Sequence, residues 1–155
     1  STPVYVAGIP GQLKCFLDRL HNSFYGYYEK PSMRHLKSIG FIAQGGCMYG
    51  GQELAMQNII HHAVLINSIP VAPDGSYIGA GGWTCDRGDK GAIEELATTG
   101  CDYITQTINV SQSVVRRVVE LAALLKAGSL ALKEVIKKDA RYIPYLSRIE
   151  KEKEA

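Results

Sequence analysis

The sequence predicts an α/β fold built on parallel strands. Short apolar runs alternate with segments of helical periodicity along the 155 residues. The runs at 38–43 and 69–73 are both bounded by turn residues, as buried strands are, and a segment of helical pattern separates them. Consecutive parallel strands need a helical crossover of this kind, so the order strand–helix–strand favours a parallel sheet.

The chain opens with an extended stretch that is followed by a helix. Thr2 precedes a proline, which disfavours the helical region for that residue. From Gln12 onward, apolar residues recur at the spacing of one helix face, and this predicts an amphipathic helix. The residues of this stripe are Leu13, Phe16, Leu17 and Leu20. A loop rich in tyrosine and glycine is expected over 22–33.

The middle of the chain predicts strand, glycine turn, helix and strand in that order. The strand at 38–43 leads into the turn, and a helix is expected over about 51–67. The second strand, 69–73, contains two prolines, which place it at a sheet edge or at a strand end. The glycine-rich stretch 74–91 is interpreted as one long loop.

The C-terminal part is predicted to be helical. We place a helix N-cap at Asp89, after which apolar residues keep helical spacing to about residue 126. This is either one helix of more than 30 residues or two helices that break near Asn109. Gly128 is expected to end it, and a last helix begins at Ser129. The predicted organisation is a domain at 1–128 with a helical arm at 129–155.

Composition argues against several classes of partner. The net charge is only +2, and the C-terminal lysines alternate with acidic residues, so no basic face for nucleic acid is expected. No apolar run reaches the roughly 20 residues that span a bilayer. The four cysteines lack metal-site spacing, which argues against a metal or cluster site built from this chain alone. Free thiols in a cytoplasmic protein fit this pattern best.

The turn after the first strand is the strongest functional feature. It is AQGGCMYGGQE, residues 43–53, where two glycine pairs flank Cys47, Met48 and Tyr49. It lacks the Lys-Ser/Thr of a P-loop and the spacing GxGxxG. Bare amides beside soft side chains suit a flat, partly apolar ligand, and such loops lie at the ligand-binding edge of an α/β sheet. The alternative is a surface turn that only needs positive φ.

Three segments resemble the NADPH-dependent FMN reductase and iron–sulfur flavoprotein family. STPVYVAGIPGQLKCFLDRL resembles the family segment S-P-V-Y-x-x-x-x-x-G-Q-L-K-x-F-x-D-R. GGQE at 50–53 resembles its second loop, and SYIGAGGW at 76–83 resembles its third. The resemblance covers about residues 1–105. It implies a flavodoxin-like fold, a three-layer sandwich with a parallel sheet, and FMN as the cofactor.

The resemblance also implies which residues contact the flavin. Two loops border the isoalloxazine ring largely through main-chain groups, and backbone donors near N1, O2, O4 and N5 would stabilise the reduced ring. The implied cofactor-binding residues are Pro3, Val4, Tyr5 and Val6 from the first loop, and Gln44, Gly45, Gly46, Cys47, Met48, Tyr49, Gly50 and Gly51 from the second. No acid–base residue is required from either loop.

The family's N-terminal part has no counterpart in this sequence. Members begin with a strand and a Ser/Thr-rich loop that holds the FMN phosphate, and iron–sulfur members carry their cysteine cluster in the same half. We therefore expect this chain to be the C-terminal portion of a longer protein; the alternative is that a second polypeptide supplies the first half of the sheet. An iron–sulfur cluster would require residues outside this chain.

Several conspicuous side chains carry two interpretations. Trp83 and Tyr77 flank the third loop, where they would either cover the flavin or a bound nicotinamide or quinone, or pack in the core or an interface. Trp83 is our candidate for a substrate contact. Cys47 is interpreted as a small space-filling residue rather than a redox group. His61 and His62 are assigned a structural or subunit-interface role.

Three functions follow from the resemblance. The first is an FMN-dependent oxidoreductase that moves electrons from NAD(P)H to a quinone, free flavin or other small acceptor. The second is an electron-transfer protein of the iron–sulfur flavoprotein type, which serves a redox partner without a substrate of its own. The third is an interaction module that has lost flavin binding. Because relatives are oligomers with flavin sites near subunit contacts, a homo-oligomer is expected.

Overall fold

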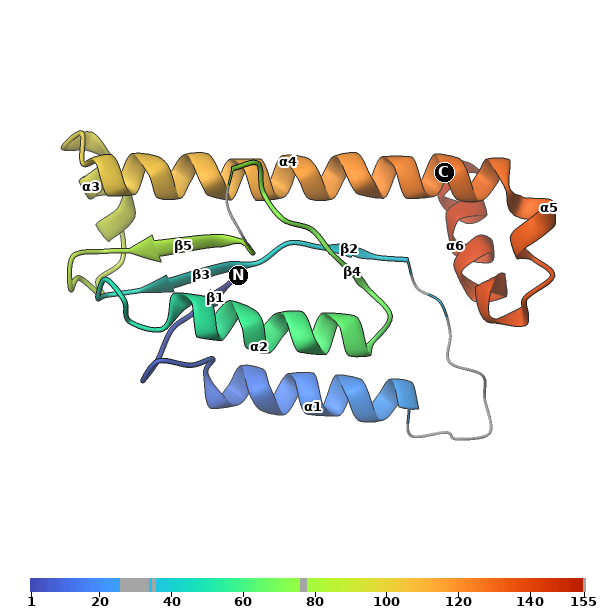
Figure 1. Ribbon diagram of the computed structural model, residues 1–155, viewed down its shortest axis with the longest axis horizontal. Helices are drawn as coiled ribbons and strands as arrows, with labels where there is room; N and C mark the ends of the chain where they lie inside the picture. Colours follow the sequence, from blue (N-terminus) through green and yellow to red (C-terminus); the bar gives the residue numbers. More distant parts are fainter. Residues whose placement is uncertain (26–33, 35, 76–77, 155) are drawn as a thin grey trace.

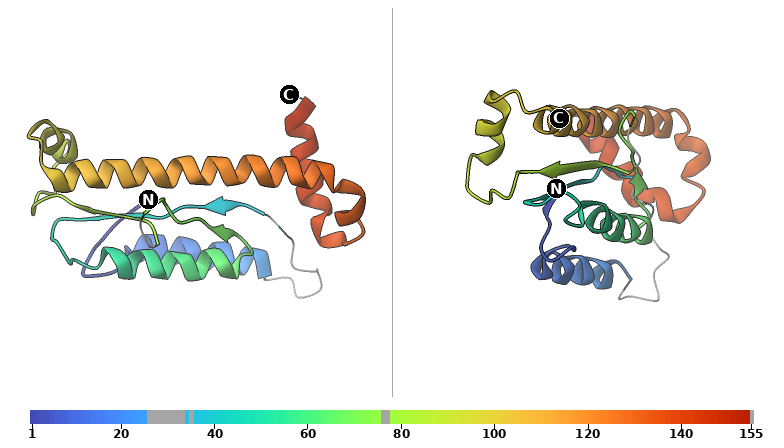
Figure 2. Two further views of the ribbon diagram at one scale, coloured as in Figure 1. Left: turned by 45° about the horizontal axis from the view of Figure 1, so that its top comes forward. Right: turned by 60° about the vertical axis from the view of Figure 1, so that its left-hand side comes forward.

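The computed structural model describes residues 1–25, 34, 36–75 and 78–154 and arranges them in three layers (Figure 1). A parallel sheet forms the middle layer. Helix α4 (Asp102–Ala131) crosses one face, and α2 (Gln52–Leu65) covers the other. Helix α1 (Gly11–Tyr25) packs against α2 (Figure 2). The predicted α/β sandwich with a parallel sheet is confirmed.

The sheet consists of two parallel ladders. The larger ladder has the order β1-β3-β5, and the smaller one pairs β2 with β4. All of these pairs are parallel, with Pro3 opposite Gln44 and Gly45 opposite Trp83 in the larger ladder. The strands are β1 (Thr2–Pro3), β2 (Ser38–Ile39), β3 (Ile42–Gly45), β4 (Ile69–Pro70) and β5 (Ala80–Trp83).

The strand predicted at 38–43 is divided between these two ladders. β2 pairs with β4, and β3 pairs with β1 and β5. Gly40 lies at the division, where α4 passes close to the sheet. A Cβ added to Gly40 would lie 2.3 Å from Cγ1 of Val114 on α4, so only glycine fits this approach without repacking.

Strand β5 was missed by the sequence prediction, which assigned one long loop to 74–91. Gly81 and Gly82 are poor strand formers, and they masked it. In the structure a Cβ on Gly82 would approach Cγ2 of Thr107 to 3.2 Å, so the glycine permits close packing beneath α4. Residues 26–33 of the loop predicted at 22–33, and Tyr77, lie outside the described residues.

The C-terminal helices differ from the prediction in three places. The break falls at Gly100 (φ +69°), between α3 (Ala92–Thr98) and α4, and not near Asn109. Gly91 (φ +89°) is the N-cap of α3, because the carboxylate of Asp89 is occupied by a neighbouring arginine. Helix α4 continues through Gly128, which a helix tolerates where its backbone is unhindered. No described helix is both long and apolar enough to cross a membrane.

The C-terminal arm folds back against the end of α4 (Figure 1). It contains α5 (Lys133–Ile136), the 3₁₀ turn η1 (Ala140–Tyr142) and α6 (Ile143–Glu154). The predicted helix start at Ser129 is wrong, because Ser129 lies inside α4 and accepts a hydrogen bond from the hydroxyl of Tyr145 at 3.1 Å. Tyr145, Leu146 and Ile149 form a hydrophobic cluster that is separate from the main core.

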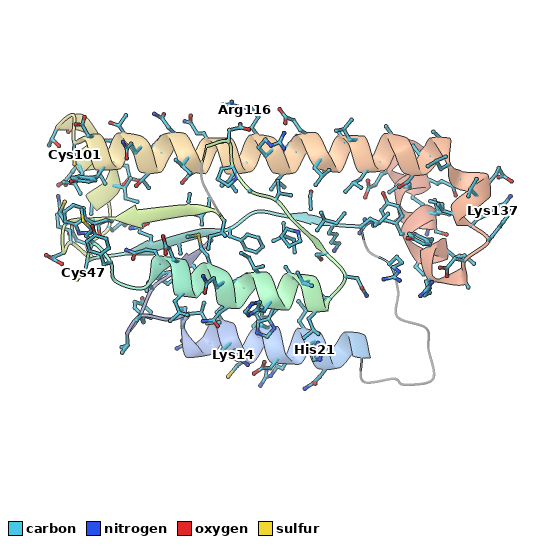
Figure 3. The ribbon with its side chains drawn as sticks, in the orientation of Figure 1. Lys14, His21, Cys47, Cys101, Arg116 and Lys137 are labelled. Atoms are coloured by element: carbon cyan, nitrogen blue, oxygen red, sulfur yellow. The ribbon has the colours of Figure 1, made fainter. Side chains whose placement is uncertain are left out.

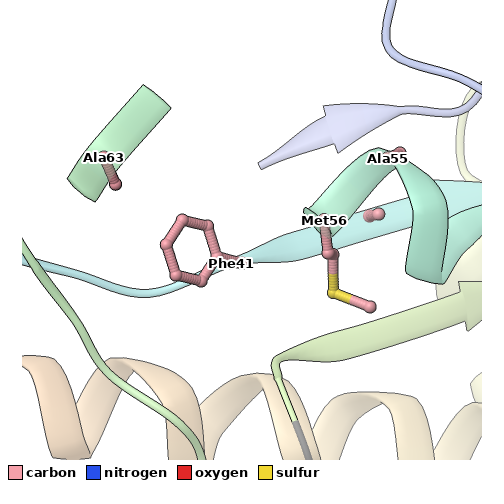
Figure 4. Packing of buried hydrophobic residues seen from close by; sticks show 5 residues of the cluster. Phe41, Ala55, Met56 and Ala63 are labelled. Carbon is pink, nitrogen blue, oxygen red and sulfur yellow. The ribbon is translucent and has the colours of Figure 1, made fainter. Parts of the chain in front are cut away.

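The main core lies between β3 and α2. Its buried members are Phe41, Ala43, Ala55, Met56 and Ala63 (Figure 4). The three alanines keep α2 close to the sheet, and Phe41 and Met56 fill the remaining space. The apolar stripe predicted on α1 is less buried, and Phe16 is 58% exposed.

Candidate functional site

The candidate site lies where β1, β3 and β5 end. Because these strands are parallel, their carboxyl ends meet at one edge of the sheet, the left end in Figure 1. The loop after β1 starts at Val4, the loop after β3 covers 46–51, and the loop after β5 starts at Thr84. The two loops that the sequence analysis assigned to the flavin are therefore neighbours, and a third loop joins them.

The first two loops contact each other through their backbones. Val4 N donates a hydrogen bond of 2.7 Å to Gln44 O. Gly51, the N-cap of α2, has a left-handed φ of +101°, and a Cβ there would lie 2.4 Å from Cα of Ala7. This position therefore requires glycine for two reasons, namely its φ and the contact with the first loop.

The loop after β5 is tied to the glycine loop by two main-chain hydrogen bonds. Thr84 N donates to Gly45 O at 3.2 Å, and Asp86 N donates to Gly46 O at 2.6 Å. The ladder between β3 and β5 thus continues past the ends of both strands. These bonds use the carbonyl groups of the glycine pair, so they fix which way its peptide groups face.

Gln52 fixes the rest of the glycine loop. Its buried amide donates from Nε2 to Cys47 O at 2.8 Å and to Gly82 O at 3.1 Å. The carbonyl groups of residues 45–47 therefore all point toward the loop after β5 or toward Gln52. Since C=O and N–H point in opposite directions across a peptide unit, the N–H groups of residues 46–48 face away from these partners. Gln52 was not among the site residues predicted from the sequence.

Strained backbone gathers in the same three loops. Five residues other than glycine have positive φ there: Val6, Ala7, Tyr49, Cys85 and Asp86. Left-handed backbone costs an L-residue about 1–2 kcal/mol, and a β-branched valine is a clear outlier. Such strain concentrates at binding and catalytic sites, where the surrounding structure holds it in place.

A cavity of about 360 Å³ lies between the first and second loops. Six of the residues that the sequence analysis assigned to the flavin line it: Pro3, Val4, Tyr5, Gln44, Gly45 and Gly46. Thr84, Arg87 and Gly88 contribute from the third loop. We call this the inner cavity, because main chain forms much of its lining.

A second cavity, of about 650 Å³, lies beside β5. Met48, Tyr49, Gly51 and Trp83 of the predicted site line it, together with residues of α2 and α4. We call this the edge cavity. The rings of Trp83 and Tyr103 lie edge to face with centroids 5.2 Å apart, and Trp83 Nε1 is buried without a hydrogen-bond partner. The sequence analysis did not identify Tyr103.

Three predicted flavin contacts line neither cavity. Val6 is fully exposed, and Gly50 forms the turn in which its N–H donates to Cys47 O at 3.2 Å. Cys47 is the third, and its thiol is exposed at the same end of the molecule (Figure 3). The predicted contacts are therefore distributed over both sides of the glycine loop.

Cys47 is not the space-filling residue that the sequence suggested. Its Sγ donates a hydrogen bond of 2.9 Å to Asp86 Oδ1. This hydrogen bond and the negative charge of Asp86 raise the pKa of the thiol. A raised pKa keeps the thiol protonated at neutral pH and lowers its reactivity, because the thiolate is the nucleophile.

Arg87 lies beside the inner cavity, and two carboxylates balance its charge. Its Nε donates to Asp89 at 3.0 Å, and its Nη1 donates to Glu95 at 2.7 Å. The two carboxylates hold the guanidinium in place and raise its pKa still further, Asp89 more than Glu95. No sequence motif marked Arg87, because its partner Glu95 comes from a separate helix.

The histidine pair lies away from the site. His61 is exposed on α2, and His62 is half-buried, near Lys14 of α1. Burial is the main cause that lowers the pKa of His62. Neither residue lines either cavity. Within residues 1–25, 34, 36–75 and 78–154, no group of three or more His, Cys, Asp or Glu side chains could hold a metal ion.

Comparison with known proteins identifies a matching family and two similar relatives. The family model described as NADPH-dependent FMN reductase matches residues 1–84. An iron–sulfur flavoprotein of Methanocaldococcus jannaschii is 33% identical over 111 residues, which are 70% of this chain and 54% of that protein. An iron–sulfur flavoprotein of Archaeoglobus fulgidus is 38% identical over 92 residues, which are 56% of this chain and 44% of that protein.

The matches cover only part of this chain and part of each relative. The chain spans about half the length of the curated relatives it matches. The family match at 1–84 includes the first two loops of the site and all of β5. No solved structure matches the chain.

Proposed function

The chain belongs to the NADPH-dependent FMN reductase family, and from this premise we propose that it binds FMN in the inner cavity and transfers electrons to an acceptor. The observation that carries the proposal is the orientation of the glycine loop. The carbonyl groups of residues 45–47 are occupied by the loop after β5 and by Gln52, so the N–H groups of 46–48 face away from these partners, and Gly46 among them lines the inner cavity. A flavin ring presents several acceptor atoms along one edge, and such donors suit them.

The residues of the inner cavity fit a flavin ring. Glycines at 45 and 46 bare the main chain on one side, and the backbone of Pro3 and Val4 borders the other. Ring contact with main chain requires this absence of side chains. Arg87 lies near the rim, where Asp89 and Glu95 balance its charge, so we assign it no electrostatic role toward the ring. The described residues thus supply ring contacts, and we assign them no phosphate contact.

We propose the following division of roles. Bound FMN supplies the electron chemistry, and the protein contributes binding, orientation and electrostatics. Electrons come from NAD(P)H or a redox partner and go to a quinone, a free flavin or another small acceptor. Trp83 is the proposed substrate contact. Cys47, held as a protonated thiol by Asp86, is not required as a nucleophile.

A second function is favoured by the two relatives. Both are named iron–sulfur flavoproteins, so the chain is alternatively part of an electron carrier that serves a redox protein. A carrier needs only an exposed ring edge, whereas an NAD(P)H oxidase or quinone reductase also needs room for substrate on one ring face. The two functions share the FMN site and differ in their response to nicotinamide.

FMN titration tests the common part of the proposal. We expect the chain to quench flavin fluorescence with saturable binding and to shift the visible absorption of the flavin. Gln52→Leu should weaken FMN binding about tenfold, because the glycine loop loses both side-chain hydrogen bonds that fix it. Gln57→Leu is the matched control, because Gln57 is exposed on the same helix. This variant should bind FMN with the affinity of the wild type.

The outcomes separate the candidate functions. Anaerobic NADPH that bleaches the flavin absorption would support the reductase, and bleaching only by a reduced redox protein would support the carrier. A folded chain that FMN does not saturate would overturn both functions. The interaction module without flavin would then be the remaining hypothesis.

A further inference from the structure

The loop after β5 begins with a tight turn of strained backbone. Arg87 N donates a hydrogen bond of 3.0 Å to Thr84 O, which closes a turn of four residues. The two central residues, Cys85 and Asp86, have φ of +51° and +61°. Positive φ at both central positions is the pattern of a type I′ turn, in which glycine, asparagine and aspartate dominate. Left-handed backbone is unfavourable for Cys85, so the surrounding structure must hold the turn in this shape.

The hydroxyl of Thr84 joins the two ends of this turn. Thr84 Oγ1 donates a hydrogen bond of 2.5 Å to Arg87 O and lies 3.4 Å from Gly45 O. Thr84 N also donates to Gly45 O, at 3.2 Å. The residue is only 2% exposed, so water does not replace the hydroxyl if it is removed. Thr84 therefore ties the turn together and fastens it to the end of β3.

The centre of the turn holds the glycine loop at two points. Asp86 N donates to Gly46 O at 2.6 Å, and Asp86 Oδ1 accepts the hydrogen bond from Cys47 Sγ at 2.9 Å. Both contacts start from a residue in left-handed backbone, so both depend on the shape of the turn. The carbonyl of Gly46 and the N–H of Cys47 belong to one peptide group and point in opposite directions. The turn therefore fixes which way this peptide group of the glycine loop faces.

We propose that Thr84 is a positioning residue of the candidate site, whose hydroxyl holds the turn 84–87 in the shape that orients the glycine loop for flavin binding. Thr84 lines the inner cavity together with Gly45 and Gly46, the residues whose carbonyl groups the turn engages. It acts through the loop and not on the reacting atoms. The flavin part of this inference rests on the proposed function, whereas the hold of Thr84 on the glycine loop does not.

Alkylation of Cys47 tests the hold on the loop without any flavin. Thr84→Val keeps the shape of the side chain and removes the hydroxyl. The turn should relax and withdraw the carboxylate of Asp86, which raises the pKa of Cys47 in the wild type. The pH midpoint of alkylation by iodoacetamide should therefore move to lower pH, and the rate at pH 8 should rise about threefold or more. Thr105→Val is the matched control, because this exposed threonine donates from its hydroxyl to Cys101 O at 3.2 Å within α4.

FMN titration of the same variants tests the positioning role. Thr84→Val should weaken FMN binding about tenfold, because the peptide groups of the glycine loop lose their fixed direction. A second pair of variants keeps the inference testable if Thr84→Val does not fold. Thr84→Ser and Thr84→Ala differ only by the hydroxyl. The serine variant should retain the Cys47 midpoint and the FMN affinity of the wild type to within about threefold, and the alanine variant should lose both.

The two readouts separate failure of this inference from failure of the proposed function. An unchanged Cys47 midpoint in Thr84→Val, or equal behaviour of the serine and alanine variants, would overturn the inference whether or not the chain binds FMN. A shifted midpoint with the FMN affinity of the wild type would overturn it as well, because the hydroxyl would then order the turn without positioning a flavin contact. A wild-type chain that took up no FMN would instead overturn the proposed function and the flavin part of the inference.

Discussion

Gly51 and Gly91 both precede a helix in left-handed backbone, at φ +101° and φ +89°, but their surroundings differ. A Cβ at Gly51 would collide with the first loop, whereas a Cβ at Gly91 would meet nothing within 4 Å. Gly91→Ala should therefore cost only the backbone strain, about 1–2 kcal/mol. Gly51→Ala should cost about 1–3 kcal/mol more, because the loops must separate. Urea unfolding of both variants checks the difference, and equal losses would contradict the close approach.

The thiol of Cys47 gives a second prediction at this scale. Replacing the carboxylate by an amide, Asp86→Asn, removes the negative charge that raises the pKa of Cys47. The pH midpoint of alkylation by iodoacetamide should move to lower pH, and the rate at pH 8 should increase several-fold. Alkylation is assigned to Cys47 by peptide mass, and Cys15, which is exposed on α1, provides the internal control. An unchanged midpoint at Cys47 would show that Asp86 does not act on it.

Individual site residues could be predicted only where local sequence determines them. The glycine pairs of the second loop are such a case, since bare backbone at 45–46 and 50–51 can be seen in the sequence itself. Gln52 and Asp86 could not be predicted, because their partners come from segments about 30 to 40 positions away, and chain topology brings them together. Cys47 was interpreted as a space-filling residue because its hydrogen-bond partner, Asp86, lies 39 positions away and could not be seen in the local sequence.

At the scale of elements, the approach of α4 to the sheet depends on Gly40. Gly40→Ala should destabilise the protein by about 1–3 kcal/mol, since the methyl group overlaps Val114 and Val118. The penalty should decrease in a Val114→Ala background, which removes the nearest contact, and a double-mutant cycle measures that coupling. Gly128→Ala, inside α4 and unhindered, should instead stabilise the chain by about 0.5–1 kcal/mol. If the stability losses of Gly40→Ala and Val114→Ala were additive, the close approach of the two residues would be contradicted.

Long segments with clear boundaries predicted elements well, and short ones did not. Helix α2 was predicted to within a few residues, because residues 52–68 contain no glycine or proline and lie between the glycine turn and the strand at 69–73. β5 escaped because two of its four residues are glycine, so its strand conformation comes from pairing with β3 and from packing beneath α4. The helix break moved to Gly100 because apolar spacing continues across that residue, and periodicity does not report φ.

At the scale of the whole molecule, the chain exposes more surface than a typical folded monomer of the same mass. The accessible area is 10,085 Å², whereas a folded monomer of this mass exposes about 7,700 Å². Part of the excess lies on one face of α4, where Val115 and Val119, one turn apart, are each more than half exposed. We propose that a second copy covers this face, because a typical stable interface buries about 800 Å² on each partner.

Size-exclusion chromatography with light scattering tests this association. We expect an oligomer at micromolar concentration, and Val119→Glu should shift it toward monomer by placing a charge in the apolar face. Val135→Glu is the control, because Val135 is equally exposed but lies on the C-terminal arm. A wild-type monomer would contradict the proposal, and a stronger effect of the Val135 variant would assign the interface to the arm.

The pairing of β3 with partners from distant parts of the chain has a consequence for the order of folding. Ile42 lies opposite Ala80, 38 positions later, so this ladder must wait for a long loop to close. The hydrogen bonds of α4 join residues four apart and form within microseconds. Helix α4 can therefore form while Ile104 and Val114, its buried apolar residues, still lack the sheet that covers them. Refolding yield should consequently fall as protein concentration rises, because the exposed helix face is available to other chains.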